Sequence, residues 1–270
     1  MVSTNGIRLH VVESGEGRPL VLLHGLGWDH QLWKSVMAKF SDRYRVIAGD
    51  TRGHGYSDKP AGPYSIQQFS DDWHGALQAL EVSGACLVGF SQGGMIAQTL
   101  ALQHPGDVGA LFLACTTCRS DPGVKEILEE RIRQAKLAGP EAAARLAAKG
   151  IFAGAFAAAN PGRIEEFVRR RAAMDQDALV AATRAAYDFD VAERLRTLSV
   201  PATVVYGAED ALTPPAVVKQ LAAALPRGTV AVGVPAAGHM IPFEQPLQFE
   251  NLLAAFLEQH YPANPRRGKP

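Results

Sequence analysis

Gly89-Phe90-Ser91-Gln92-Gly93 follows directly on the apolar run Ala85-Cys86-Leu87-Val88. A serine between glycines, at the end of an apolar strand and before a helix, is the pattern of a nucleophile elbow. Glycine two residues before and two residues after the serine removes Cβ atoms that would collide in so sharp a turn. The alternative is that Ser91 only caps a helix. The five residues do not separate these two interpretations, so the partners of a catalytic serine must be sought elsewhere in the chain.

The size and charge of the chain narrow the classes of protein to consider. Its 270 residues, 47% of them hydrophobic, suffice for one large domain or for a domain with an insertion. Lys and Arg together number 27, as do Asp and Glu, so no net charge draws the chain to nucleic acid or to an anionic membrane. The polar start, residues 1–6, lacks the features of a signal peptide or a membrane span. We therefore expect a cytoplasmic protein with no nucleic-acid or membrane partner.

The three cysteines suit a reducing compartment better than a set of disulfides, because their number is odd. Cys115 and Cys118 form a C-x-x-C pair. Cys115 ends the apolar run Leu111-Phe112-Leu113-Ala114, which indicates a strand end rather than the helix start of a thioredoxin-like motif. No His or Cys lies nearby at zinc-ligand spacing. We expect neither redox chemistry nor a metal at this pair.

Apolar runs alternate with helical patterns along most of the chain. This alternation predicts an α/β fold, in which a mostly parallel sheet is flanked by helices. Several runs are too continuously apolar to have one wet face, so we expect those strands to be buried on both sides. The expected strands are Ile7–Val12, Leu20–His24, Arg45–Ala48, Ala85–Phe90, Ala110–Ala114, Ala202–Tyr206 and Thr229–Val234. The expected helices are Gln31–Phe40, Ile66–Leu80, Gln92–His104, Ala216–Leu225 and Leu247–His260.

One segment breaks the alternation. From about Arg119 to Leu198 the chain is Ala-rich and helical, between two strands of one sheet. A crossover needs far fewer residues, so we interpret 119–198 as a helical cap inserted before the penultimate strand, rather than as crossover helices without function. Such a cap would cover the carboxyl ends of the strands, where α/β sheets bind ligands. Residues 1–118 and 199–261 then form the core, and 262–270 a disordered tail.

A catalytic Ser91 needs a histidine to accept its proton and an acid to orient that histidine. The apolar strand that begins near Val204 runs through a glycine turn into Glu209 and Asp210, which sets a carboxylate at a strand end. After the last strand, His239 follows a glycine in a loop. The chain therefore offers Ser91, Asp210 and His239 as a candidate triad.

Each partner has rivals. Asp121 follows the strand that ends near Ala114, and Glu209 is adjacent to Asp210. We rank Asp210 first as the acid, Asp121 second and Glu209 third. Three other histidines are better explained by structural roles than by catalysis. His24 lies in a turn, His54 between glycines and His104 at a helix end.

Acyl transfer also needs two N–H groups directed at the oxygen of its tetrahedral intermediate. Gln92 follows the candidate nucleophile at the N-terminus of a helix and offers one of them. We expect Leu26, in the glycine-rich loop after the strand that contains Val21-Leu22-Leu23, to offer the other, although a plain strand-to-helix connection also explains this loop. Trp28, Phe90 and residues of the cap are expected to form the apolar walls of a substrate pocket.

Taken in chain order, these motifs resemble the α/β-hydrolase superfamily. The resemblance covers nearly the whole chain apart from the cap, and the order Ser, Asp, His is the one found in this fold. It rests on His24-Gly25, Asp50 to Ser57, the Ser91 elbow with Gly94, Gly207 to Asp210, and Gly238-His239. Within the superfamily, the Asp50 to Ser57 segment and the short cap look like the 3-oxoadipate enol-lactonase group and its carboxylesterase relatives. That likeness implies hydrolysis of an ester or lactone through an acyl-enzyme, without cofactor or metal.

Three hypotheses are compatible with this resemblance. The first is a serine hydrolase of a small carboxylic ester or lactone. The second keeps the triad but makes the chain a carbon–carbon bond hydrolase or a cofactor-free haloperoxidase or perhydrolase, and the third makes it a small-molecule receptor on a hydrolase fold. A basic group in the pocket, from Arg169-Arg170-Arg171, would favour a substrate that bears a carboxylate, whereas an all-apolar pocket would favour neutral esters.

Overall fold

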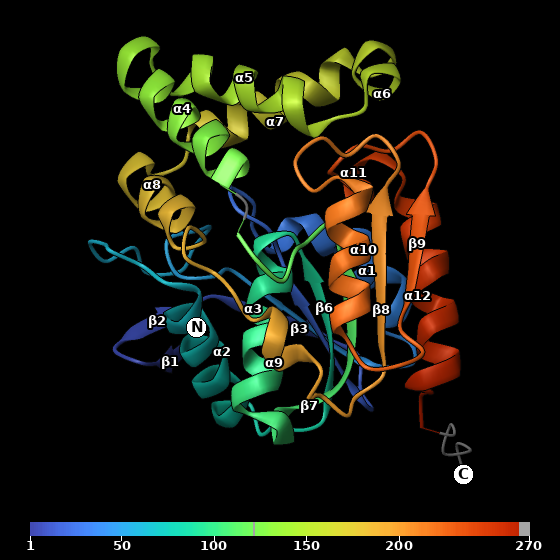
Figure 1. The fold of residues 1–270 in the computed structure, drawn as a ribbon. Coiled ribbons are helices and arrows are strands. Elements are labelled where there is room, and N and C mark those ends of the chain that lie inside the picture. Colours follow the sequence, from blue (N-terminus) through green and yellow to red (C-terminus); the bar gives the residue numbers. More distant parts are fainter. Residues whose placement is uncertain (121, 265–270) are drawn as a thin grey trace.

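Seven strands form one central sheet in the computed structural model, which describes residues 1–120 and 122–264 (Figure 1). Six of these strands are parallel, and β3 at one edge runs antiparallel to its neighbour β5. In spatial order they are β3 (Val11–Ser14), β5 (Arg45–Gly49), β4 (Pro19–Leu23), β6 (Ala85–Phe90), β7 (Val108–Ala114), β8 (Ala202–Gly207) and β9 (Val230–Val234). The predicted α/β class, with a mostly parallel sheet flanked by helices, is confirmed.

Both faces of the sheet are covered. In β4, Leu20 and Leu22 belong to the apolar core on one face, whereas Val21 and Leu23 belong to the core on the other, because successive side chains of a strand point to opposite sides. The first core includes residues of α1 (Lys34–Phe40) and α12 (Pro246–His260), and the second includes residues of α2 (Ile66–Ala79), α3 (Gln92–Gln103) and α10 (Pro215–Ala224). Burial on both faces is what the continuous apolar runs predicted.

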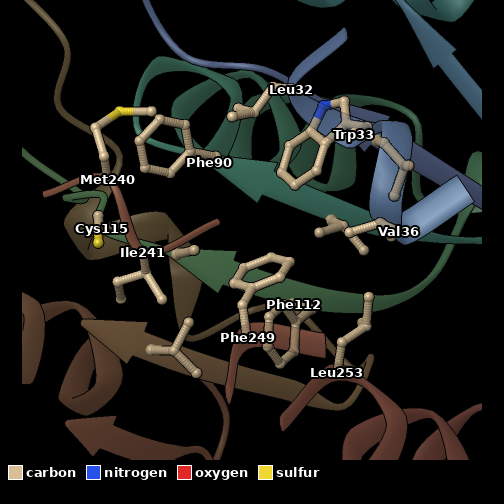
Figure 2. Packing of buried hydrophobic residues seen from close by; sticks show 14 of the residues in the cluster. Leu32, Trp33, Val36, Phe90, Phe112, Cys115, Met240, Ile241, Phe249 and Leu253 are labelled. Atoms are coloured by element: carbon tan, nitrogen blue, oxygen red, sulfur yellow. The ribbon is translucent and has the colours of Figure 1, made fainter. Parts of the chain in front are cut away.

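Large aromatic side chains fill the core between the sheet, α1 and α12. Figure 2 shows Trp33 and Phe249 with Phe112 of β7 among these residues. The rings of Phe112 and Phe249 meet edge to face, with centroids 5.5 Å apart, and the Trp33 and Phe249 centroids lie 5.9 Å apart. Trp33 ends the 3-10 helix η1 (His30–Trp33), so this packing anchors the loop between β4 and η1.

The first predicted strand, Ile7–Val12, is wrong as a single element. The chain instead changes sheet at His10, where β2 (Ile7–Leu9) ends before β3 begins. β2 pairs with β1 (Val2–Thr4) in a separate two-stranded sheet. The N–H of His10 donates to the side chain of Ser57, and this contact interrupts the strand. Because buried Ile7 and Leu9 pack with Ala76 of α2, the small sheet lies against that helix.

Four helices lie over the carboxyl ends of the strands at the top of Figure 1, and a fifth lies below them at the left. They are α4 (Pro122–Ala138), α5 (Pro140–Ile151), α6 (Gly154–Ala159), α7 (Pro161–Ala172) and α8 (Gln176–Arg184). The short α9 (Ala192–Leu195) packs instead against α3 and α10, and its Leu195 is buried in the core. The limits of the cap as a domain, 119–198, stay a prediction.

At the other end of the sheet, Tyr261 closes the core after α12. It is 1% exposed, and its hydroxyl lies 3.0 Å from the carbonyl oxygen of Pro19 and 2.9 Å from that of Gly84, where β4 and β6 begin. The carbonyl of Tyr261 accepts a hydrogen bond from the hydroxyl of Tyr44. Tyr261 therefore holds the last helix against the starts of two central strands.

Two further points concern the C-terminal tail and the question of a membrane-spanning helix. Within the predicted tail, 262–270, residues 265–270 lie outside the described residues. Among the helices of the described ranges, we find none with the length and apolar character needed to cross a membrane.

Candidate active site

The turn from β6 into α3 holds Ser91 in a backbone conformation that side chains rarely adopt. Its φ is +53° and its ψ is −118°. A Cβ atom on Gly89 would lie 2.6 Å from the Cα of Gly94, and one on Gly93 would lie 2.1 Å from the carbonyl oxygen of Leu23. Only glycine fits at these two positions. The strained turn places Ser91 at the carboxyl end of the sheet, below the cap.

Side chains from three separate loops form one hydrogen-bonded chain. Ser91 Oγ lies 2.9 Å from His239 Nε2, and His239 Nδ1 lies 2.8 Å from Asp210 Oδ2. An ionised carboxylate only accepts, so the Nδ1–H of His239 donates to Asp210 and leaves Nε2 free to accept from the Ser91 hydroxyl. His239 and Asp210 are each 3% exposed. The structure thus brings together the three residues that the sequence suggested as a triad.

Asp210 sits in a dense set of donors. Its Oδ1 accepts from the N–H groups of Leu212 and Thr213, each at 2.8 Å, and its Oδ2 accepts from the Thr213 hydroxyl as well as from His239. Burial on its own raises the pKa of Asp210, but His239 and the donors of Thr213 outweigh it and bring the pKa below its ordinary value. The carboxylate is therefore charged at neutral pH and fixed beside His239.

The rival acids differ in their surroundings. Glu209 is exposed, and its N–H donates to the carbonyl of Ala237. Asp121, the second candidate, lies outside the described residues. Among the residues that are described, Asp210 is the acid that hydrogen-bonds to His239.

The expected oxyanion donors are the backbone N–H groups of Leu26 and Gln92. Leu26 and Gln92 both line the cleft that Ser91 faces. Neither N–H has an acceptor among the residues that the structure describes. Gln92 is the first residue of α3, so its N–H lies outside the hydrogen-bond ladder of the helix. Its side chain donates instead to the carbonyl of Ala182 in α8, which ties the start of α3 to the cap.

His24 and His54 hold the loop that carries Leu26, as their structural interpretation from the sequence implied. His24 Nε2 accepts from the N–H of Thr51, and His54 Nε2 accepts from the N–H of Gly27. Burial lowers the pKa of His54 to about 3, helped by the neighbouring His24. Both rings act as neutral hydrogen-bond partners of backbone groups.

Glu244 is a site residue that sequence reasoning missed. It lies in the short helix α11 (Ile241–Glu244), and its carboxylate accepts from the N–H groups of Gly238 and Met240, on both sides of His239. It also accepts from the N–H of Ala153 in the cap. Burial raises its pKa, and the three backbone donors only partly offset this effect. The sequence shows an acid five residues after His239 but no sign that it turns inward.

The cleft in front of Ser91 has an empty volume of about 880 Å³, including the part open to solvent. Trp28 and Phe90 line it as expected, 6% and 1% exposed, and the Phe90 ring lies 5.3 Å from the His239 ring. Arg171, within the basic triplet noted in the sequence, also lines it, and so does Arg131, which sequence reasoning did not single out. The pocket is thus apolar near the serine and basic toward the cap.

None of the three cysteines lines the cleft. Cys86, Cys115 and Cys118 are free and buried, and burial raises the pKa of each thiol. Two groups in the described ranges place three potential metal-ligand atoms within 4.8 Å of one another: His10, His30 and Asp50, and Cys115, Asp210 and His239. In both groups the carboxylate is already hydrogen-bonded to a histidine ring and to backbone N–H groups.

Comparison with known proteins agrees with this geometry. A family model described as the alpha/beta hydrolase fold matches residues 18–246, a range that contains Ser91, Asp210 and His239. The chain belongs to this family. As an α/β hydrolase it carries the expected elbow, the parallel sheet and the helical segment that lies above the sheet.

Three relatives resemble this α/β hydrolase over most of their length. The 3-oxoadipate enol-lactonase 2 of Acinetobacter baylyi is 29% identical over 240 residues, 89% of this chain and 88% of that protein. The enol-lactonase of Burkholderia xenovorans is 28% identical with a TM-score of 0.88, covering 94% of this chain and 98% of that one. A thermophilic esterase from Thermogutta terrifontis, solved with malate bound, is 27% identical with a TM-score of 0.87, covering 95% and 96%.

Proposed function

We propose that this α/β hydrolase cleaves a small carboxylic ester or lactone through an acyl-enzyme on Ser91. The observation that carries the proposal is the hydrogen-bonded chain from Ser91 through His239 to Asp210, at the wall of a cleft that Ser91 and His239 both line. The similar proteins support the choice of bond, since two of them are named enol-lactonases and one an esterase.

Acylation follows from the hydrogen bond between Ser91 and His239. As the serine oxygen attacks the substrate carbonyl carbon, His239 Nε2 takes the hydroxyl proton, and Asp210 stabilises the resulting imidazolium. The carbonyl oxygen becomes an oxyanion, to which the N–H groups of Leu26 and Gln92 donate. The N-terminus of α3 adds favourable partial charge at the same place. These donors are free of other described partners, as this role requires.

Deacylation reverses the proton transfers. Collapse of the first intermediate breaks the carbon–oxygen bond of the leaving group, and the alkoxide takes the proton from Nε2. His239 then removes a proton from water, whose oxygen attacks the acyl carbon, and the proton returns to Ser91 as the acid departs. With a lactone, the alkoxide stays attached to the acyl group, so a single hydroxy acid leaves.

Replacing Ser91 tests the proposal. Ser91→Ala should abolish turnover of p-nitrophenyl acetate, measured as release of p-nitrophenol. Among the described residues, no other hydroxyl or thiol is paired with Nε2 of His239; the Thr213 hydroxyl lies near Nδ1, which Asp210 occupies. Ser41→Ala, at the C-terminal end of α1, serves as the control and should behave like the wild type. Mass spectrometry of the wild type during turnover should find the acetyl group on the peptide that contains Ser91. Wild-type turnover by Ser91→Ala would exclude the proposed mechanism.

A further inference from the structure

Three arginines line the Ser91 cleft, and one of them, Arg119, pairs with Asp190 at 2.7 Å. The other two lie in helices of the cap. Arg131 belongs to α4 and Arg171 to α7, and both also border a smaller cavity inside the cap. Arg171 is 9% exposed and Arg131 is half-buried. Arginine is rarely this buried unless it is paired with an acid.

Neither arginine has such a partner. Other arginines of the cap do: Arg184, for example, pairs with Glu129 at 3.2 Å. Across residues 1–120 and 122–264, no Asp or Glu forms an ion pair with Arg131 or Arg171. Arg171, which is buried, and Arg131, which is half-buried, thus carry positive charges without a counter-charge from the described protein.

Their charges also repel each other. Burial lowers the pKa of Arg131. Burial lowers the pKa of Arg171 to about 10, and the charge of Arg131 contributes to this shift. Both side chains nevertheless stay protonated at neutral pH. Two unpaired cations in one cleft are unfavourable for the empty protein and favourable for binding an anion.

Arg171 lies close to the reacting centre. Its Nη1 is 3.4 Å from the carbonyl oxygen of Leu26, a residue that lines the Ser91 cleft. A Cβ atom on Gly27 would lie only 1.9 Å from the same Nη1, so the guanidinium rests directly on this loop. An anion bound by Arg171 is therefore within the reach of one small molecule from the carbonyl that Ser91 would attack.

We propose that Arg131 and Arg171 form a carboxylate subsite, and that the substrate is an ester or lactone that bears a free carboxylate a short chain away from the scissile carbonyl. This inference rests on the proposed function of Ser91. The planar guanidinium groups match the two oxygens of a carboxylate. The apolar side chains of Trp28 and Phe90 would contact the methylene groups between the carboxylate and the scissile carbonyl of the substrate, and would exclude water from them.

A matched pair of esters tests the subsite. Mono-p-nitrophenyl adipate carries a free carboxylate, and methyl p-nitrophenyl adipate has the same chain and leaving group with that carboxylate capped. We expect the wild type to have the higher kcat/KM for the free acid. Arg171→Met and Arg131→Met should each lower the ratio of the two kcat/KM values at least ten-fold, mainly through KM. Arg184→Met removes an exposed, paired cap arginine that lies outside the cleft and should leave the ratio unchanged.

A binding measurement separates this inference from the hydrolase mechanism. Adipate itself should raise the Tm of the wild type and of Ser91→Ala, but not that of Arg171→Met. Without ligand, Arg171→Met should have a Tm at or above that of the wild type, because an unpaired buried charge has been removed. A wild type that prefers the capped ester, or variants that keep the wild-type ratio and the adipate shift, would overturn the subsite even if Ser91 proves to be the nucleophile. If neither ester is cleaved but the adipate shift depends on Arg171, the subsite stands and the hydrolase proposal fails.

Discussion

Asp210 receives four hydrogen bonds, and His239 supplies only one of them. The other three come from Leu212 and Thr213 and hold the carboxylate in place. In Asp210→Asn an amide group would face these donors or His239. If it faces His239, the ring changes tautomer and Nε2 can no longer accept from Ser91. We expect kcat for p-nitrophenyl acetate to fall about 10³–10⁴-fold with the fold retained.

Glu209 provides the matched control for this substitution. It is the neighbouring acid and is exposed, so Glu209→Gln should leave kcat close to that of the wild type. Steady-state kinetics with circular dichroism on both variants gives the answer. Equal losses in the two variants would contradict the role assigned to Asp210.

His54 makes stability depend on pH. Its pKa is about 3 in the folded protein, against about 6.5 for a free histidine, so the unfolded chain binds more protons between these values. The stability that neutral His54 provides is therefore present above pH 6.5 and is lost as the pH falls toward 3. By this linkage, the free energy of unfolding should decrease by about 2 kcal/mol between pH 6.5 and pH 5.

A variant without a titrating ring isolates this effect. His54→Gln keeps an acceptor for the N–H of Gly27 and should flatten the pH dependence over that range. Urea unfolding at several pH values measures both slopes. If the variant and the wild type lose stability in parallel, other groups cause the acid sensitivity.

At the scale of single residues, the sequence indicated the candidate site residues that stand in a recognisable local motif. Ser91 and His239 stand beside glycines in recognisable turns, and Asp210 follows a strand that ends in a glycine. Glu244 and Arg131 carry no such mark. Their importance comes from contacts with segments far away in the chain, which no local pattern encodes. Whether the named residues act as proposed stays a prediction.

The β6–α3 elbow depends on close approach of two backbones. In Gly93→Ala the new Cβ would meet the carbonyl oxygen of Leu23 at 2.1 Å, and a backbone atom of β4 cannot move aside without disturbing the sheet. We expect a loss of about 3 kcal/mol in the free energy of unfolding and a large fall in kcat, because the turn that holds Ser91 must shift.

Gly106 offers the control for this substitution. It lies in the short 3-10 helix η2 (Pro105–Asp107), where an added Cβ would meet nothing within 4 Å. Gly106→Ala should leave both stability and kcat near the wild-type values. Chemical unfolding and steady-state kinetics on the two variants decide the matter, and a Gly93→Ala protein as stable as the wild type would contradict the predicted clash.

The elements predicted best are those with strong periodicity or continuous apolar runs. β6 and α3 begin where the sequence indicated, because the apolar run and the glycine turn coincide there. The strand predicted over Ile7–Val12 divides at His10 because of a side chain from the loop after β5, a tertiary contact invisible in the local pattern. α9 likewise lies within the segment predicted as the cap, 119–198, but packs against the core, where Leu195 is buried.

Across the whole molecule, the cap holds the loop of His239. The N–H of His239 donates to the carbonyl of Ile151 at 2.7 Å, and Glu244 joins that loop to Ala153. In Glu244→Gln one of the carboxylate oxygens becomes an amide that cannot accept. We expect a loss of about 2 kcal/mol in stability and a fall in kcat of about ten- to a hundred-fold, since His239 is no longer held at hydrogen-bond distance from Ser91.

Glu258 is the comparison for Glu244. It is exposed on α12 and reaches only Arg43, at 3.8 Å, so Glu258→Gln should change neither quantity appreciably. Thermal unfolding and kinetics on both variants measure the difference. Full activity of Glu244→Gln would mean that the loop of His239 keeps its position without help from the cap.

The position of Tyr261 near the end of the chain determines when the core can close during synthesis. Its hydroxyl contacts Pro19 across 242 positions of the chain. On a ribosome, β4 and β6 emerge long before Tyr261. Their amino-terminal ends stay uncovered until Tyr261 leaves the exit tunnel. A contact of such long range closes late in folding. The apolar strands of the nascent chain therefore have α2 and α3 on one face but only α1 on the other until α12 and Tyr261 are in place.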